Sequence, residues 1–158
     1  MEFMEVIRKR FSIRKYKTDP VPDELLNQVL EAARLAPSAG NSQPWHFIVV
    51  KDPQTKKMLD ISEWAQQAPV VIVGCTEASD PTDIAIAFEH LVLAATNFGL
   101  ATCWIGRWGA DEEIKKALGI PRNIRVLAVT PLGYGAESRA PKPRKPLSEI
   151  VHRERFAR

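Results

Sequence analysis

Several signals of common protein classes are absent from this chain of 158 residues. Its two cysteines, Cys75 and Cys103, form no CxxC pair and are too few for a disulfide framework. The longest apolar run, Ile84 to Phe98, is interrupted by Glu89 and His90 and is shorter than the roughly 20 apolar residues that a membrane span needs. No charged-then-apolar leader opens the sequence. We therefore expect a cytoplasmic protein that does not associate with a membrane.

Motifs of a protein-borne catalytic machinery are also missing. The sequence contains no GxGxxG, GxxxxGK[ST], HExxH or GxSxG. The three histidines, His46, His90 and His152, lie far apart without the spacing of metal ligands. We predict no metal site and no catalytic side chain, and we interpret His90 as a hydrogen-bonded core histidine. Any catalysis would have to come from a bound cofactor.

Positive charge is concentrated at the two ends of the chain. The formal net charge is +3, but residues 139–158 alone carry +5, so the rest carries −2. The basic residues of the C-terminal segment are Arg139, Lys142, Arg144, Lys145, Arg153, Arg155 and Arg158. Residues 1–17 hold a second cluster, made of Arg8, Lys9, Arg10, Arg14, Lys15 and Lys17. This distribution indicates an anionic partner. We expect no nucleic acid, because basic and aromatic residues do not interleave.

Helical and extended patterns alternate along the sequence, which predicts a layered α/β or α+β fold. Residues 84–98 are apolar nearly all round, which predicts a helix buried on every side and ended by Gly99. Asp111 is expected to cap a short helix that runs to Leu118 and is closed by Gly119 and Pro121. The other predicted helices span residues 2–9 and 22–35, and the predicted strands span residues 45–51, 70–75, 102–105 and 125–132.

The segment after Gly135 differs from the rest of the chain. Pro141, Pro143 and Pro146 keep it extended, and it has few apolar residues with which to form a core. Such a basic, proline-stiffened arm needs another surface to lie on, and a partner subunit is the simplest candidate.

The first candidate binding element is a basic strip formed by Arg10, Ser12 and Arg14. In an extended segment these three side chains lie on one side, while Phe11 and Ile13 lie on the other. A guanidinium group presents paired donors that match the oxygens of a phosphate or a carboxylate. A solvated basic edge would give the same pattern.

The second candidate is the segment Ala36–Trp45, between a predicted helix and a predicted strand. Its small residues let the backbone approach a ligand, and Ser38, Asn41 and Gln43 offer both donors and acceptors. A flat heterocycle with carbonyls and ring nitrogens requires that mixture. An ordinary polar loop that bonds its own turns is the alternative.

The third candidate is the pair Lys142 and Arg144, which share one side of an extended segment and could close on the same anion as Arg10 and Arg14. A solvated basic tail is the commoner explanation of such a run. The tryptophans Trp45, Trp64, Trp104 and Trp108 are expected in the core or at an interface, and one of them could line a flat substrate.

Four segments carry a resemblance to a known family. Arg10-Phe-Ser-Ile-Arg14 resembles the opening R-x-S-x-R element of the FMN-dependent nitroreductase family. Pro37-Ser-Ala-Gly-Asn-Ser-Gln-Pro-Trp45 is similar to its P-S-x-x-N-x-Q-P-W loop. Gly99-Leu-Ala-Thr-Cys-Trp-Ile-Gly106 resembles G-L-G-T-C-W-I-G, with Ala101 in place of a glycine, and Lys142-Pro-Arg144-Lys-Pro146 resembles the C-terminal K-x-R-x-P. The motifs occur in family order from end to end of the chain.

The resemblance implies an α+β protein with a three-layer α/β/α nitroreductase-like fold and a central mixed sheet. Residues 1–158 would form a single FMN-binding domain, in which the extended arm 136–158 is exchanged between the subunits of a homodimer. FMN would bind at the subunit interface, and the helix over residues 84–98 could supply the core of that interface.

The resemblance also assigns roles to individual residues. The phosphate, ribityl chain and pyrimidine edge of FMN would be held by Arg10, Ser12 and Arg14, and charge at the phosphate would be added by Lys142 and Arg144 of the arm. The isoalloxazine ring would be covered by residues of the other subunit, namely Pro37, Ser38, Ala39, Asn41 and Gln43. Its N5 and O4 would face the backbone amides of Ile105 and Gly106.

The implied reaction is a ping-pong transfer of electrons from NADH or NADPH through FMN to a nitroaromatic, a quinone or a similar small-molecule acceptor. One alternative keeps the fold but changes the acceptor, as in reductive dehalogenation or the reduction of an activated alkene. A second alternative is an FMN-binding protein that is not an enzyme.

Overall fold

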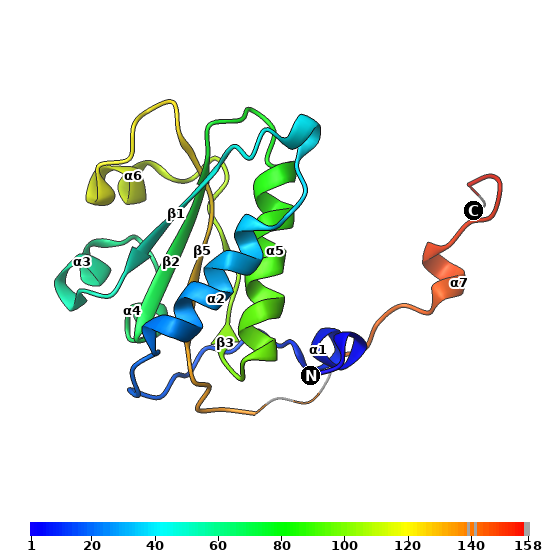
Figure 1. Ribbon diagram of the computed structural model, residues 1–158, viewed down its shortest axis with the longest axis horizontal. Coiled ribbons are helices and arrows are strands. Elements are labelled where there is room, and N and C mark those ends of the chain that lie inside the picture. The colour runs from blue at the N-terminus through cyan, green and yellow to red at the C-terminus, as the bar shows by residue number, and fades with distance from the viewer. Residues whose placement is uncertain (139, 141, 157–158) are drawn as a thin grey trace.

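The structure is a computed structural model that describes residues 1–138, 140 and 142–156. A body made of one sheet with helices on both faces carries an arm that leaves it after Gly135 and ends in the short helix α7 (Leu147–Ile150) (Figure 1). Helix α1 (Phe3–Lys9) lies beside the body near the start of the arm. No helix of the described residues is both long and apolar enough to cross a membrane.

The sheet contains five strands, and every strand pair in it is antiparallel. The order is β1 (Trp45–Val50), β2 (Val70–Thr76), β5 (Arg125–Gly133) and β3 (Ala101–Thr102), and β4 (Ile105–Gly106) also pairs with β5. A single parallel bridge joins Ser12 to Thr102 at the outer edge of β3. The predicted mixed character of the sheet therefore rests on this one bridge.

Helices cover both faces of the sheet, and this confirms the predicted three-layer α+β architecture. Helices α2 (Asp23–Arg34) and α5 (Thr82–Asn97) lie on one face, and α3 (Pro53–Met58), α4 (Glu63–Gln66) and α6 (Glu112–Leu118) lie on the other (Figure 1). Strand β2 supplies both cores by alternation: Val70 and Ile72 face α5, whereas Val71 and Val73 face the other layer. All four side chains are buried, and each contributes about 1.5–3 kcal/mol of hydrophobic stabilisation.

The predicted strand over residues 102–105 is divided into β3 and β4. Both pieces keep one register against β5, with Thr102 opposite Leu132 and Ile105 opposite Val129, so Cys103 faces Pro131. Proline has no N–H to donate to the ladder. The N–H of Cys103 donates to Thr130 Oγ1 instead, at 3.2 Å. The backbone therefore continues as one strand, and only the hydrogen bonding is interrupted.

Helix α5 is not buried on every side, contrary to the prediction. Its inner face is buried, with Ala87, Phe88 and Leu91 inaccessible to solvent, but Ile86 and Glu89 are exposed. The apolar content of this helix exceeds what one sheet can cover, so one face remains outside the core of a single chain. The predicted stop at Gly99 is confirmed, since this residue adopts a left-handed conformation (φ 75°).

The predicted capping role of Asp111 is wrong, although the helix after it forms. Asp111 is buried, and its Oδ2 accepts the N–H of Val126 at 2.8 Å, so the carboxylate joins α6 to β5. No side-chain hydrogen bond caps α6. Gly119 ends the helix in a left-handed conformation (φ 65°), as expected.

Candidate functional site

The basic strip lies along the edge of the sheet at β3. Ser12 bridges to Thr102, and the N–H of Ile13 donates to the Thr102 carbonyl at 3.0 Å. Ile13 is buried and anchors the strip, as predicted. The N–H of Arg14 donates to Glu137 Oε1 at 2.6 Å, which ties the strip to the beginning of the arm.

The two arginines of the strip have different neighbours. The guanidinium carbon of Arg14 lies 5.9 Å from the ring centroid of Trp64 in α4, on one face of the sheet. Arg10 acts on Glu89 of α5, on the other face. Loss of hydration raises the pKa of the Glu89 carboxyl, and the charge of Arg10, followed by that of His90, opposes the rise. The strip therefore presents positive charge on both sides of the sheet edge.

The loop before β1 has an unusual backbone. It contains a short 3-10 turn, Ala39–Asn41, in which Gly40 (φ 58°) is followed by left-handed Asn41 (φ 57°) and then by left-handed Gln43 (φ 50°). Non-glycine residues in this region carry strain of order 1 kcal/mol each, which proteins tend to retain at binding sites. Ser38 Oγ accepts the N–H of Gln43, as an ordinary turn would require, but the Asn41 side chain makes no hydrogen bond within the described part of the chain.

This loop and the strip lie at opposite ends of α5 (Figure 1). The N–H of Ala39 donates to Asp83 Oδ1 at 3.1 Å, at the N-terminal end of the helix. Ser12 pairs with Thr102, which follows the C-terminal end. The helix has 16 residues and is therefore about 24 Å long. One chain does not bring the strip and the loop around the same ring.

Strand β4 leaves an open sheet edge beyond the strip. The N–H of Arg107 donates to the Leu127 carbonyl of β5 at 2.8 Å. Backbone N–H groups alternate between the two sides of a strand, so that of Ile105 also points toward β5 and that of Gly106 points away. β4 pairs only with β5 among the described residues, and a Cβ added to Gly106 would meet no atom within 4 Å. A donor therefore faces open space at Gly106.

Trp104 lies next to this open space. It is 37% exposed, and its ring meets that of Phe88 in α5 edge to face, with the centroids 4.6 Å apart. Residues two apart in a strand share a face, so Trp104 and Gly106 lie on the α5 face together. The other three tryptophans are half-buried and pack against the two cores, as the sequence predicted.

Arg107 was not identified from the sequence. Its Nε is buried and has no hydrogen-bond partner among residues 1–138, 140 and 142–156. Its position directly after the segment Gly99–Gly106 was the only signal in the sequence, and that segment drew attention to backbone groups rather than to the next side chain. Trp64, which lies beside Arg14, was named only among the four tryptophans expected in the core or at an interface.

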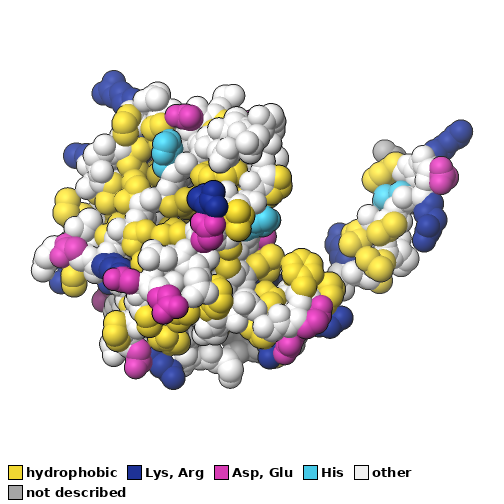
Figure 2. Space-filling view, in the orientation of Figure 1, with side chains coloured by type: hydrophobic (Ala, Val, Ile, Leu, Met, Phe, Trp, Pro, Cys, Tyr) yellow, Lys and Arg dark blue, Asp and Glu magenta, His cyan; other side chains and the backbone are white. Residues whose placement is uncertain are grey.

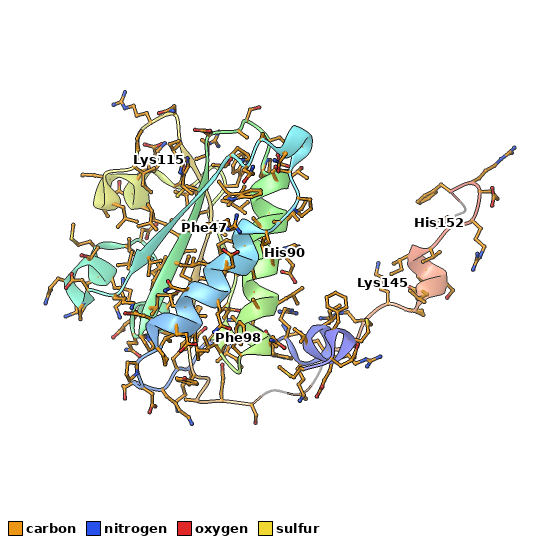
Figure 3. The ribbon with its side chains drawn as sticks, viewed as in Figure 1. Phe47, His90, Phe98, Lys115, Lys145 and His152 are labelled. Carbon is orange, nitrogen blue, oxygen red and sulfur yellow. The ribbon has the colours of Figure 1, made fainter. Side chains whose placement is uncertain are left out.

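The basic pair of the arm does not reach the strip in this chain. Lys142 and Arg144 are exposed, and Arg144 Nη1 donates to the carbonyls of Lys142 and Pro143, both at 3.2 Å. Figure 3 shows Lys145 and His152 on the same arm, away from the body. Four residues of the predicted arm, Arg139, Pro141, Ala157 and Arg158, lie outside the described residues.

An apolar groove runs between α1, α2 and α5. It has a volume of about 490 Å³ and is lined by side chains that include Phe3, Leu35 and Leu93, with His90 among them. His90 Nδ1 lies 3.3 Å from the Ala32 carbonyl, as expected of a hydrogen-bonded histidine, but the side chain is half-buried in the groove and not in the core, contrary to the prediction. Figure 2 shows hydrophobic side chains around α1 and again along the arm.

Comparison with known proteins agrees with the fold and with the motifs. The model of the nitroreductase family matches residues 7–74 and 61–134. The chain belongs to the nitroreductase family. It is therefore an enzyme of the oxidoreductase class.

Individual relatives match nearly the whole chain. A putative NADH dehydrogenase/NAD(P)H nitroreductase of Archaeoglobus fulgidus is 36% identical over an alignment of 178 positions, gaps included. The alignment covers 98% of this chain and 99% of the relative. The structure of an FMN-dependent nitroreductase of Clostridium difficile superimposes with a TM-score of 0.89 at 29% identity and covers 97% of this chain and 99% of its own. A more distant relative, iodotyrosine deiodinase 1 of Sus scrofa, is 27% identical over 95% of this chain and 68% of its own length.

Proposed function

We propose that this nitroreductase-family enzyme binds FMN between the two subunits of a homodimer and uses NADH or NADPH to reduce a small oxidised acceptor by a ping-pong mechanism. Nitroaromatics and quinones are the acceptors that the family resemblance favours.

One observation carries the shared site: the two binding elements lie about 24 Å apart, at opposite ends of α5. When two copies pack their α5 helices antiparallel about a two-fold axis, the N-terminal end of one helix lies at the C-terminal end of the other. The loop of each copy then approaches the strip of its partner. The exposed face of α5, with Ile86 and Glu89, is the surface that such a dimer would cover.

The described residues fit FMN. Open space over Gly106 can admit a flat ring, and the outward N–H of that residue offers a donor to its polar edge. When bound, FMN supplies the redox chemistry, by taking up a hydride from NAD(P)H and giving two electrons to the acceptor.

The protein residues have binding and electrostatic roles in this proposal. Arg10, Ser12 and Arg14 hold the phosphate, the ribityl chain and the pyrimidine edge. The Gly106 N–H stabilises negative charge on the polar edge of the ring, whereas the Ile105 N–H, which points toward β5, does not reach the ring. Pro37, Ser38, Ala39, Asn41 and Gln43 of the second copy cover the ring, and Trp104 bounds the space beside Gly106.

The arm supports the dimer. Leu147, Ile150, Val151 and Phe156 are all exposed, and Phe156 is 80% exposed, on a segment with no core of its own. Burying such side chains in the groove of a second copy would remove apolar surface from water on both partners. The same exchange would carry Lys142 and Arg144 to the phosphate of a site in the dimer.

The visible spectrum of the purified protein tests the proposal. We expect a yellow protein with the absorption bands of bound flavin, which anaerobic NADH or NADPH bleaches and a nitroaromatic or a quinone restores. A colourless protein that does not retain added FMN would refute flavin binding. Bound flavin that neither nicotinamide bleaches would identify a non-enzymatic FMN-binding protein.

Reductive dehalogenation is a second candidate, because iodotyrosine deiodinase 1 is among the relatives. The same reduced protein, mixed under anaerobic conditions with 3-iodotyrosine, menadione or nitrofurazone, separates the candidates. Reoxidation of the flavin by the quinone or by the nitro compound, but not by the iodinated amino acid, supports the proposed acceptors. The reverse order would support a dehalogenase.

A further inference from the structure

Trp104 is held on one side and open on the other. Its ring meets that of Phe88 edge to face, with the centroids 4.6 Å apart and an angle of 68° between the planes. Phe88 is inaccessible to solvent and lies against Gly74 of β2, so it has little room to move. Trp104 itself remains 37% exposed. A rigid contact therefore holds an indole that still presents apolar surface to its surroundings.

The other three tryptophans are more completely covered than Trp104. Trp45 and Trp108 pack against the core on the α5 face, and Trp64 packs against the core on the other face. The guanidinium of Arg125 also covers Trp108, 4.6 Å from its ring centroid. No cation from the described part of the chain lies over Trp104 in this way. Aromatic rings prefer offset or edge-to-face contacts with centroids about 4.5–7 Å apart, so a second aromatic ring fits the open side of Trp104.

Trp104 lies midway between the two parts of the proposed cofactor site. Ser12 of the strip pairs with Thr102, and the N–H that points away from β5 is that of Gly106. At about 3.3 Å per residue these two positions are roughly 13 Å apart along the sheet edge, with Trp104 between them. A ligand that accepts the Gly106 N–H and also reaches the strip must therefore pass the exposed indole.

Trp104 and Gly106 also lie on the same face of the sheet. Residues two apart in a strand share a face, and the contact with Phe88 shows that this face is the one that α5 covers. The residue between them, Ile105, packs against the opposite core. A Cβ at Gly106 would meet no atom within 4 Å. The exposed indole and the open space over Gly106 are therefore adjacent.

We propose that Trp104 is a further cofactor-binding residue: its exposed surface packs against the isoalloxazine ring of FMN and keeps the polar edge of the ring at the Gly106 N–H. This inference rests on the proposed function, because it needs FMN at the edge of β4. Phe88 holds the indole from behind, so the flavin meets a surface that is already in position. The family resemblance assigns only backbone amides to this segment, and the structure adds a side chain.

An indole in contact with a flavin has an optical signature. When the flavin is excited by light, one electron passes from the indole to the flavin and then returns, so the emission is quenched and no net reaction occurs. The rate of this transfer falls steeply with distance, so strong quenching requires near contact. Phenylalanine has an aromatic ring but is far harder to oxidise. Trp104→Phe therefore keeps most of the packing and removes the electron donor.

The test compares Trp104→Phe with Trp64→Phe in the full-length, FMN-loaded protein. Trp64 is the matched control, because the same exchange is made in α4, on the opposite face of the sheet. Two quantities are measured for each variant: the fluorescence lifetime of bound FMN, and the dissociation constant of FMN from ultrafiltration. For Trp104→Phe we expect the lifetime to increase several-fold, while the dissociation constant stays close to that of the wild type. For Trp64→Phe we expect both quantities to equal those of the wild type.

Trp104→Ala removes the ring as well as the electron donor. We expect this variant to bind FMN roughly five- to 150-fold more weakly, which is the range found when an aromatic side chain that stacks on a flat heterocycle is removed. Urea denaturation of the flavin-free variant shows whether the fold is retained. The phenylalanine variant keeps the test decisive if the alanine variant does not fold.

Bound FMN that is as strongly quenched in Trp104→Phe as in the wild type would overturn the inference and leave the proposed function intact. Recovery of the emission in Trp64→Phe would also overturn it, because the flavin would then lie on the other face of the sheet. Failure of the wild type to bind FMN would instead refute the proposed function.

Discussion

Gly74 of β2 lies directly against the ring of Phe88 in α5, and a Cβ at this glycine would come within 2.7 Å of Phe88 Cδ2. The same ring meets Trp104 edge to face at 4.6 Å. Gly74, Phe88 and Trp104 therefore form one line of contacts from the centre of the sheet to its open edge. The absence of a side chain at Gly74 sets how closely α5 packs, and α5 in turn fixes the position of Trp104.

Gly74→Ala should lower the free energy of unfolding by about 1–3 kcal/mol, because the added methyl group overpacks a core in which Phe88 is already held by Trp104. Urea denaturation of the flavin-free protein measures the effect. Gly106→Ala is the matched control, since its Cβ would meet nothing within 4 Å. It should preserve stability and weaken FMN binding, because the methyl group occupies the proposed ring site. Equal loss of stability in both variants would contradict this account.

Arg14→Ala should weaken the retention of FMN. A charge-assisted hydrogen bond is worth about 1.5–3 kcal/mol, which corresponds to a loss of affinity of roughly ten- to 150-fold. Titration of flavin-free protein with FMN gives the dissociation constant. Arg34→Ala serves as a control, because Arg34 forms its ion pair with Glu31 on α2 and is exposed. Flavin content that survives dialysis equally well in both variants would argue against a role for the strip.

Glu89 should make the stability of the flavin-free protein depend on pH. Loss of hydration raises the pKa of its carboxyl above the ordinary value of 4.5, with Arg10 and His90 opposing. A carboxyl group whose pKa is raised in the folded state destabilises that state when it ionises. This destabilisation by Glu89 is absent below pH 4.5, where the group is protonated in both states, and it appears as the pH rises above that value.

Glu89→Gln should therefore match the wild type in acid and exceed it in stability at neutral pH. Urea denaturation midpoints of the flavin-free proteins across this range provide the measurement, with Glu113→Gln, on the exposed side of α6, as a control for a general charge effect. A glutamine variant that is less stable than the wild type at neutral pH would show that attraction to Arg10 outweighs the loss of hydration.

Much of the fold could be predicted because strong local signals coincide with the packing. The apolar runs at β2 and β5 are buried in the sheet, and left-handed glycines end α5 and α6 where the sequence predicted. Helices α3, α4 and α7 were missed because they are short, and α7 interrupts an arm that was predicted to be extended. Helix α3 did have a signal, since Asp52 Oδ2 accepts the N–H of Thr55 and Pro53 occupies the first turn.

Tertiary relationships set the limits of prediction. The interruption of hydrogen bonding at Cys103 depends on Pro131, which is distant in the sequence but opposite in the sheet. Asp111 looks like a helix cap until β5 offers it the N–H of Val126. In the candidate site, the residue types of the strip and the loop indicated binding. Their separation along α5, and the unpartnered Nε of Arg107, became visible only in three dimensions.

The most direct test of the shared site is the FMN content of a heterodimer made from Arg14→Ala and Asn41→Ala subunits, co-expressed with different affinity tags and purified through both. One site of this heterodimer combines both substitutions, and the other combines an intact strip with an intact loop. We predict that each substitution alone depletes FMN from its homodimer and that the heterodimer binds one FMN per two chains. A heterodimer as depleted as its parents would contradict a site built from two copies of the chain.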